Sequence, residues 1–372
     1  MRQNNEIKYF LILGCLVAFM PIIQMIFKPF KLIGLDGAFT IKEKPNFSWE
    51  TFLDGSYQQQ TDAYLKDNTA FRGDLVRLRN QINYALFGDI NTILTLGKEN
   101  YLFDPNYIFA REGTDLLHDS IFAKNKILIE NGCSKLKKLN IPIIFCIAPN
   151  KANFYSEFLP YPSKLGIKTN QKYFDFLLKT NNITTLNFDQ LFINLKNNSK
   201  YPLIPKYGAH WSIYGASIAA DSLLKSLNIT AKKKFVEMGV SKIDISEKAK
   251  FTDDDLLGSL NLIWKWKSPT MAYPILNLKV ENKPNLLIVS DSYFWSFYEL
   301  GIVKNCFSPN SQMWYYNKSV YDINREKIND RNDKIIYDDL KGRDAIIIMA
   351  TGPSLKDFAY GFFTQLNTLK IP

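Results

Sequence analysis

Histidine is scarce in this chain: His118 and His210 are the only two among 372 residues. Neither belongs to an H-x-H or H-E-x-x-H pattern, and the four cysteines include no C-x-x-C pair. Because zinc sites are built from closely spaced His and Cys ligands, the sequence indicates no metal centre. The acidic run at 253–255 lacks the glycine and glutamate of an EF-hand loop. We interpret this run as a solvated turn or the start of a helix.

Nucleotide-binding motifs are also missing. The chain contains neither G-x-x-x-x-G-K-[ST] nor G-x-G-x-x-G, which are the patterns that cradle phosphates, so we expect no cofactor. The formal net charge is +10, but the lysines are scattered and do not interleave with aromatic residues as they do in a nucleic-acid groove. A solvated lysine-rich surface is the preferred interpretation, and affinity for lipid headgroups or an acidic polymer stays open.

One long apolar run is present, at residues 9–27, where Gln24 is the only polar side chain. A run of this length is near the minimum that spans a bilayer and exceeds most signal-peptide cores. The basic segment KPFK at 28–31 follows it, in place of a small-x-small cleavage site. We therefore predict an uncleaved signal anchor at residues 1–30, with the bulk of the chain outside the cytoplasm. The positive flanks on both sides support this orientation only partly, and a buried core helix is the alternative.

Beyond the anchor, residues 31–96 are expected to form a juxtamembrane and helical segment, with an amphipathic pattern at 58–87 that breaks near Asn68. In the catalytic domain expected at 97–372, helical and apolar strand patterns alternate. This alternation predicts an α/β fold with a parallel sheet covered by helices. The predicted elements are helices at 120–139, at 169–180 and from 213, and strands at 141–148, 183–188, 286–289 and 344–350. Residues 229–284 are expected to be an irregular excursion.

Ser292 stands where the apolar strand at 286–289 ends and a helix is expected to begin. Open α/β sheets place their sites at the carboxyl ends of parallel strands. A helix N-terminus beside the hydroxyl would favour developing negative charge. The alternative is that Ser292 merely caps the helix.

His210 is the candidate general base. It lies in a loop next to Trp211 and ahead of a helix that Ser212 is placed to cap. A serine–histidine pair would activate the hydroxyl by proton transfer and allow a covalent acyl-enzyme. Nothing in the sequence shows that His210 and Ser292 meet, and His118 is interpreted as a structural or surface residue.

Four short motifs occur in a fixed order: GKENYLF at 97–103, APNK at 148–151, HWS at 210–212 followed by Gly215, and VSDS at 289–292. In this order they resemble the alginate O-acetyltransferase (AlgX/AlgJ-like) family, over roughly residues 50–355. The resemblance implies a three-layer SGNH-hydrolase-like fold in a circularly permuted form. It also implies that Ser292 is the nucleophile and His210 the general base.

The chain departs from the family at the catalytic acid. In the family, an aspartate usually lies two residues before the histidine, where this chain has Gly208. Asp291 is then the candidate acid, although a residue adjacent to the nucleophile points a different way and can also serve only to shape the turn. A Ser–His dyad, or an acid from elsewhere in the chain, is equally open.

Members of this family place an acetyl group on hydroxyls of an exported polysaccharide, after a multipass membrane-bound O-acyltransferase supplies it across the membrane. The resemblance implies the same function here: a membrane-anchored O-acetyltransferase with an acyl-serine intermediate, acting at the cell membrane with its catalytic domain periplasmic or extracellular. The alternatives are a carbohydrate acyl esterase that uses the same site, and a catalytically impaired glycan-binding subunit of an export complex, which the missing acid motivates.

Several side chains near these motifs are candidates for contacting the sugar. We expect Trp211, Tyr293, Tyr315 and Asn150 to bind substrate, since the rings of Tyr293 and Tyr315 can stack on sugar rings. Trp295 and Trp314 are further aromatic candidates. For at least half of the aromatic residues, a place in the hydrophobic core is the better interpretation.

Overall fold

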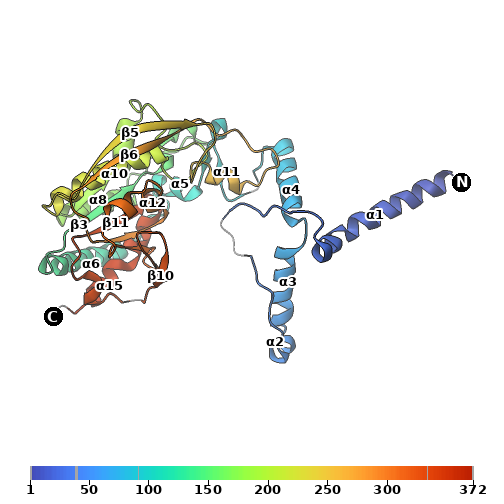
Figure 1. Ribbon diagram of the computed structural model, residues 1–372, viewed down its shortest axis with the longest axis horizontal. Helices are drawn as coiled ribbons and strands as arrows, with labels where there is room; N and C mark the ends of the chain where they lie inside the picture. The colour runs from blue at the N-terminus through green and yellow to red at the C-terminus, as the bar shows by residue number, and fades with distance from the viewer. Residues whose placement is uncertain (1, 38–40, 91, 333, 371–372) are drawn as a thin grey trace. The chain divides into compact units, whose positions relative to one another are not determined.

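The computed structural model describes residues 2–37, 41–90, 92–332 and 334–370, which form two compact units (Figure 1). One unit comprises residues 1–92 and 256–266, and the other comprises 93–255 and 267–372. The domain boundaries expected from the sequence, after residues 30 and 96, stay predictions.

A seven-stranded sheet forms the centre of the larger unit, with the order β10-β9-β8-β7-β11-β3-β4. The five strands from β8 to β4 run parallel, and β9 and β10 extend one edge in antiparallel fashion. The strands are β3 (Ile143–Ala148), β4 (Thr184–Asn187), β7 (Leu286–Ser290), β8 (Gln312–Tyr315), β9 (Ser319–Tyr321), β10 (Lys327–Asp330) and β11 (Ala345–Thr351). The α/β class with a mostly parallel sheet is therefore confirmed.

The sheet is covered on both faces, which explains the unbroken apolar strands in the sequence. Along β11, Ala345 and Ile347 pack into one hydrophobic cluster, while Ile346 and Ile348 pack into another. The first face carries α5 (Pro105–Glu112), α7 (Lys151–Phe154), α9 (Phe188–Leu195), α10 (Ile213–Thr230), α12 (Trp295–Glu299) and α13 (Ile302–Cys306). The second carries α6 (Asp119–Lys138), α8 (Asn170–Thr180), α14 (Tyr337–Leu340) and α15 (Phe362–Thr368), and Figure 1 shows α6 beside α15. The result is a three-layer arrangement.

The region expected to be irregular contains a long hairpin instead. Strands β5 (Val236–Ser246) and β6 (Met271–Val280) pair antiparallel as a separate two-stranded sheet. The prediction failed because apolar residues alternate with polar ones only as far as Val240. A register shift between Val240 and Lys242 then changes the phase of the pattern, as a β-bulge does. A second small sheet joins β1 (Thr95–Leu96) and β2 (Leu102–Phe103).

The smaller unit begins with the apolar helix α1 (Arg2–Phe27). Its segment Ile7–Phe27 has 21 residues and a mean hydropathy of 2.5, so by length and composition it can cross a membrane. Gln24, the polar exception in the run, has its side-chain amide satisfied at both ends: it donates to the carbonyl of Phe30 (2.6 Å) and accepts from the amide of the same residue (3.0 Å). These bonds offset the cost of placing a polar group near the end of an apolar helix.

Helices α2 (Trp49–Leu53), α3 (Ser56–Asn68) and α4 (Arg72–Phe87) follow, and the break expected near Asn68 is confirmed. The segment 256–266 belongs to this unit because amide side chains join it there. Asn261 exchanges two hydrogen bonds with the main chain of Asp36, and Gln81 accepts from the Trp264 amide at 3.0 Å. Helix α11 (Asp255–Ser259) marks the point where the chain leaves the larger unit.

Candidate active site

The site lies at the carboxyl edge of the parallel sheet, as expected for an α/β fold. The strand register places Ser290, the last residue of β7, beside Tyr315 of β8 and Met349 of β11. The chain then turns through Asp291 into the short 3-10 helix η3 (Ser292–Phe294). Ser292 therefore follows the end of a buried central strand, where its side chain is only partly covered.

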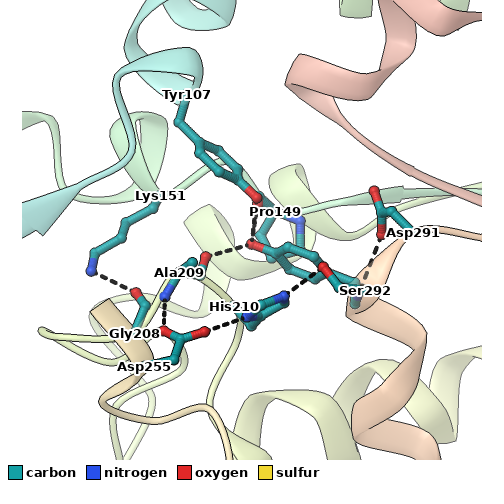
Figure 2. A network of polar contacts seen from close by, with 10 residues as sticks. Tyr107, Pro149, Lys151, Gly208, Ala209, His210, Asp255, Asp291 and Ser292 are labelled. Carbon is teal, nitrogen blue, oxygen red and sulfur yellow. Dashed lines mark hydrogen bonds and ion pairs between the residues drawn. The ribbon is translucent and has the colours of Figure 1, made fainter. Parts of the chain in front are cut away.

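Ser292 and His210 are in direct contact, although 82 residues separate them in sequence: the serine Oγ lies 2.7 Å from the histidine Nε2 (Figure 2). His210 is held just ahead of α10, which Ser212 caps by accepting a hydrogen bond from the Gly215 amide at 2.9 Å. The cap fixes where the helix begins, and thereby where the preceding histidine stands.

The second ring nitrogen of His210 has an acidic partner, Asp255. The distance from His210 Nδ1 to Asp255 Oδ2 is 3.0 Å, and Asp255 Oδ1 accepts from the Ala209 amide at 2.9 Å. A carboxylate on Nδ1 keeps the proton there, so that Nε2 can accept the proton of Ser292. Ser292, His210 and Asp255 thus form a continuous serine–histidine–aspartate relay (Figure 2).

Asp255 is a candidate functional residue that the sequence alone did not indicate. It belongs to the 253–255 run that was interpreted as a solvated turn or a helix start, and it is indeed the first residue of α11. Its side chain is 31 % exposed, against 14 % for His210. The alternative of an acid from elsewhere in the chain is the one that the geometry supports. Nothing in the spacing could have singled out Asp255, since 45 residues separate it from His210.

Gly208 explains how the acid can come from that segment. A Cβ atom at this position would lie 2.5 Å from the carbonyl oxygen of Thr252, 2.6 Å from the ring of Pro205 and 3.1 Å from the carbonyl oxygen of Asp253. The backbone of 252–253 therefore occupies the space that a side chain at 208 would need. This close approach carries Asp255, a few residues further on, to the histidine loop.

Placing an aspartate at position 208 is therefore expected to damage the site. In Gly208→Asp, the new Cβ must displace backbone at 252–253, so ester turnover should fall by about 10- to 100-fold and stability by roughly 1–3 kcal/mol. Gly208→Ala adds the same Cβ without a carboxyl group and serves as the matched control. Steady-state ester hydrolysis and thermal melts measure both effects. If Gly208→Asp restored turnover to a chain that also carries Asp255→Ala, this interpretation would be wrong.

Asp291 does not serve as the acid partner that we considered. It is 2 % exposed, and its Oδ1 accepts from the Tyr293 amide at 3.1 Å. Its Oδ2 accepts from the Thr351 amide and the Tyr360 hydroxyl, at 3.1 and 3.0 Å. Burial raises the pKa of Asp291, and these hydrogen bonds oppose the rise. The expectation fails because both oxygens are already used: Oδ1 within the turn after β7, and Oδ2 between that turn and the end of β11.

Most of the expected sugar-contacting residues lie in the scaffold. Trp211 is 0 % exposed and Tyr293 only 1 %. The Tyr293 hydroxyl donates to the carbonyl of Ala209 at 2.9 Å, which makes it a support of the histidine loop. Asn150 is also 1 % exposed, and it caps α7 through its side-chain oxygen. Residues that are inaccessible in this way cannot contact a polymer without rearrangement, so the prediction for these three was wrong.

Two tyrosines near Ser292 are only half-buried. Tyr315 ends β8 and is half-buried, with its ring 5.3 Å from that of Trp295. Tyr316, the next residue, interacts with Ser292. Burial, together with the negative charge of Asp291, raises the pKa of the Tyr316 hydroxyl. It stays protonated at neutral pH and can donate a hydrogen bond beside the serine. In the described part of the chain, no group of three or more His, Cys, Asp or Glu residues could hold a metal ion.

Comparison with known proteins gives likeness at the level of solved structures alone. No protein-family model and no curated protein matches the sequence. The O-acetyltransferase domain of Pseudomonas putida AlgJ is 15 % identical, with a TM-score of 0.46 over 74 % of this chain and 98 % of that one. Pseudomonas aeruginosa AlgX is 14 % identical, with a TM-score of 0.40 over 70 % of this chain and 55 % of its own. Bacillus cereus PatB1 is 12 % identical, with a TM-score of 0.46 over 73 % and 99 %.

Proposed function

We propose that this protein is a membrane-anchored O-acetyltransferase that moves an acetyl group, through an acyl ester on Ser292, to hydroxyls of an exported or cell-surface polysaccharide. The observation that carries the proposal is the 2.7 Å contact between Ser292 Oγ and His210 Nε2, with Asp255 on the other ring nitrogen at 3.0 Å. This arrangement generates a nucleophilic serine at neutral pH without a cofactor.

In the first half of the reaction, Ser292 Oγ attacks the carbonyl carbon of an acetyl donor while His210 Nε2 takes the hydroxyl proton. The resulting imidazolium is stabilised by the Asp255 carboxylate. The bond between the acetyl carbon and the donor's leaving oxygen then breaks, and His210 returns its proton to that oxygen. The products are the free donor alcohol and acetyl-Ser292.

In the second half, a sugar hydroxyl attacks the acetyl carbon and His210 Nε2 takes its proton. The ester bond to Ser292 breaks, and the serine oxygen recovers the proton from His210. The sugar leaves as an O-acetyl ester and the site returns to its starting state. His210 thus serves as base and then as acid in each half.

The proposed acceptor is supported by the order of the sequence motifs, and the proposed location is supported by the apolar N-terminal segment. The order of the four motifs resembles enzymes that acetylate exported polysaccharides, and the apolar segment Ile7–Phe27 is long enough to anchor the chain in a membrane. We propose that a multipass membrane-bound O-acyltransferase supplies the acetyl group and that the catalytic domain faces the periplasm or the exterior. We propose that the half-buried ring of Tyr315 stacks on a sugar.

An acyl esterase is the second candidate. The exposed fractions of His210 and Asp255, 14 % and 31 %, leave the site open to solvent, so that water can accept the acetyl group in place of a sugar. The third alternative was an impaired glycan-binding subunit, which the missing acid at Gly208 suggested. That reason no longer applies, because Asp255 contacts His210 in its place.

The test follows where the acetyl group goes. Full-length protein in detergent micelles is given p-nitrophenyl acetate together with cellotetraose or tetragalacturonate, and the oligosaccharides are analysed by mass spectrometry. Transfer predicts acetylated oligosaccharide whose yield rises with acceptor concentration at the expense of free acetate. Release of acetate alone, at every acceptor concentration, would favour the esterase and contradict transfer to these sugars. Incubation of the ester and sugar without protein controls for spontaneous acetylation.

A further inference from the structure

A buried lysine adjoins the relay, and the reaction described above does not use it. Lys151 opens α7, and it is only 1 % exposed. Its ammonium group donates to the main-chain carbonyls of Lys206 at 2.8 Å and Gly208 at 2.7 Å, and lies 5.6 Å from the ring centre of Phe103. Lysine is rarely buried this completely, and then usually beside a carboxylate, whereas these direct partners are neutral.

The carbonyls that Lys151 holds belong to the loop that carries the general base. Gly208 accepts from Lys151, as Figure 2 shows. Ala209 donates to Asp255 Oδ1 and accepts from the Tyr293 hydroxyl. His210 then spans Asp255 and Ser292. Consecutive residues are thus fixed one after another, and Lys151 supplies the first of these contacts.

The charge of Lys151 is costly to keep in the folded protein. Burial lowers the pKa of Lys151 to about 7, against the opposing influence of the Asp255 charge. The charged form is therefore penalised in the folded state. The hydrogen bonds to the Lys206 and Gly208 carbonyls work against this penalty, because an apolar side chain would remove a donor from each carbonyl.

We propose that Lys151 is a positioning residue for the acyl transfer: its ammonium group fixes the Lys206 and Gly208 carbonyls, so that His210 stays aligned between Asp255 and Ser292. This inference rests on the proposed function for its kinetic consequences, but its structural consequence can be measured in the resting protein. The substitutions that test it are Lys151→Met, which removes the donors at similar length, and Lys151→Arg, which keeps a charge.

The matched control is Lys135→Met. Lys135 is a half-buried lysine of α6 that also donates to main-chain carbonyls, those of Leu366 (3.2 Å), Asn367 (2.6 Å) and Leu369 (2.7 Å) near the C-terminus. It shares the chemistry of Lys151 but contacts no residue of the relay. Its loss should lower stability without altering the histidine or the rate.

The resting-state measurement uses the two histidines of the chain. Full-length protein labelled with ¹⁵N-histidine, in detergent micelles, should show a downfield Nδ1–H proton from His210 bonded to Asp255. His118→Gln removes the signals of His118, which lies at the start of α6, so that the remaining histidine signals belong to His210. We expect this resonance to be lost or broadened in Lys151→Met, to return at least partly in Lys151→Arg, and to stay unchanged in Lys135→Met.

The kinetic measurement is the rate of Ser292 acylation as a function of pH. Misalignment of His210 should lower the rate in Lys151→Met by about 10²-fold. In the parent protein the rate should fall above pH 7, because Lys151 there becomes a neutral amine, whose N–H groups hold the two carbonyls more weakly than the ammonium group does. The Met variant should lack this fall, and the Arg variant should keep its activity to higher pH.

Stability should depend on pH in a way that reports the buried charge. The penalty for the buried charge is fully present below about pH 7 and declines as pH rises from there toward 10.5. The parent should therefore gain stability relative to Lys151→Met as pH rises above 7, whichever of the two melts higher at neutral pH. A difference in melting temperature that does not change with pH over this range would contradict a buried charge at Lys151.

Other titrating groups adjoin Lys151 and need a control. The charged and titratable groups on the elements packed around it are Asp253 before α11, Asp255 at the start of α11, His210 and Tyr207 in the loop, Tyr293 in η3, Tyr107 in α5 and Asp189 in α9. Burial raises the pKa of Asp253 to about 7, which is the same range. Asp253→Asn should retain the fall above pH 7 if Lys151 causes it.

The outcomes separate the two proposals. An unchanged His210 resonance in Lys151→Met, or an acylation rate within twofold of the parent, overturns the positioning role. If the parent forms no acyl-serine but the resonance still changes in Lys151→Met alone, the proposed function fails while the positioning role stands. If Asp253→Asn abolishes the alkaline fall, that fall belongs to Asp253 and the pH part of the inference is wrong.

Discussion

Replacing Asp255 by asparagine should lower the rate of acyl-enzyme formation by on the order of 10³- to 10⁴-fold. In the parent protein, Asp255 accepts from two donors, the His210 Nδ1–H and the Ala209 amide. The amide of an asparagine has only one oxygen, so its NH₂ group must face one of these donors. If it faces His210, the ring adopts the other tautomer, and Nε2 then carries a proton and cannot accept that of Ser292.

Asp254→Asn is the matched control for this substitution. Asp254 adjoins Asp255 in sequence, but its carboxyl group faces Ser268, at 3.4 Å, and not the histidine. The rate of p-nitrophenyl acetate hydrolysis should stay within about twofold of the parent in Asp254→Asn and collapse in Asp255→Asn. Equal rates in the two variants would show that Asp255 is not the acid of the site.

The largest expected effect belongs to Ser292→Ala, which should abolish the acyl adduct and lower ester turnover by about 10⁶-fold, toward the uncatalysed rate. The reason is that, among the described residues, the hydroxyl in contact with His210 Nε2 is that of Ser292, at 2.7 Å. His210→Ala should give a loss of similar size, and the double variant should lose little more, because the two residues act as one unit.

Ser296→Ala provides a control for fold effects in this segment. Ser296 lies one helical turn further on, in α12, and is 3 % exposed, whereas Ser292 is half-buried. Its turnover should match that of the parent. Substantial turnover in Ser292→Ala, with an unchanged melting temperature, would mean that the nucleophile has been assigned to the wrong residue.

The sheet could be predicted from the sequence because its strands are short apolar runs. Residues 286–289 and 344–350 correspond to β7 (Leu286–Ser290) and β11 (Ala345–Thr351). Burial on both faces leaves no polar position in such strands, and the run itself is then the signal. The hairpin of β5 and β6 gave no comparable signal, because exposed lysines and a shift in register disturb its alternation.

Within the site, the sequence predicted the residues that adjoin regular elements and missed those that depend on tertiary contacts. Ser292 follows the end of an apolar strand, and His210 precedes a helix that Ser212 caps, so both had a recognisable signal in the sequence. Asp255 carries no such mark, because only the approach of 252–253 to Gly208 brings it to the histidine. The prediction for Trp211 and Tyr293 failed for a related reason. The sequence around a catalytic motif looks the same whether an aromatic side chain there faces the substrate or the hydrophobic core.

The most direct test of a Ser292–His210–Asp255 relay is rapid-quench intact mass analysis with peptide mapping, after mixing full-length protein with p-nitrophenyl acetate. We expect the parent to gain the mass of one acetyl group within its first turnover, on the peptide that contains Ser292. Asp255→Asn should acquire the same adduct far more slowly, and Ser292→Ala should not acquire it. An acetyl group on another residue, or equal rates of acetylation in the parent and in Asp255→Asn, would contradict the assignment.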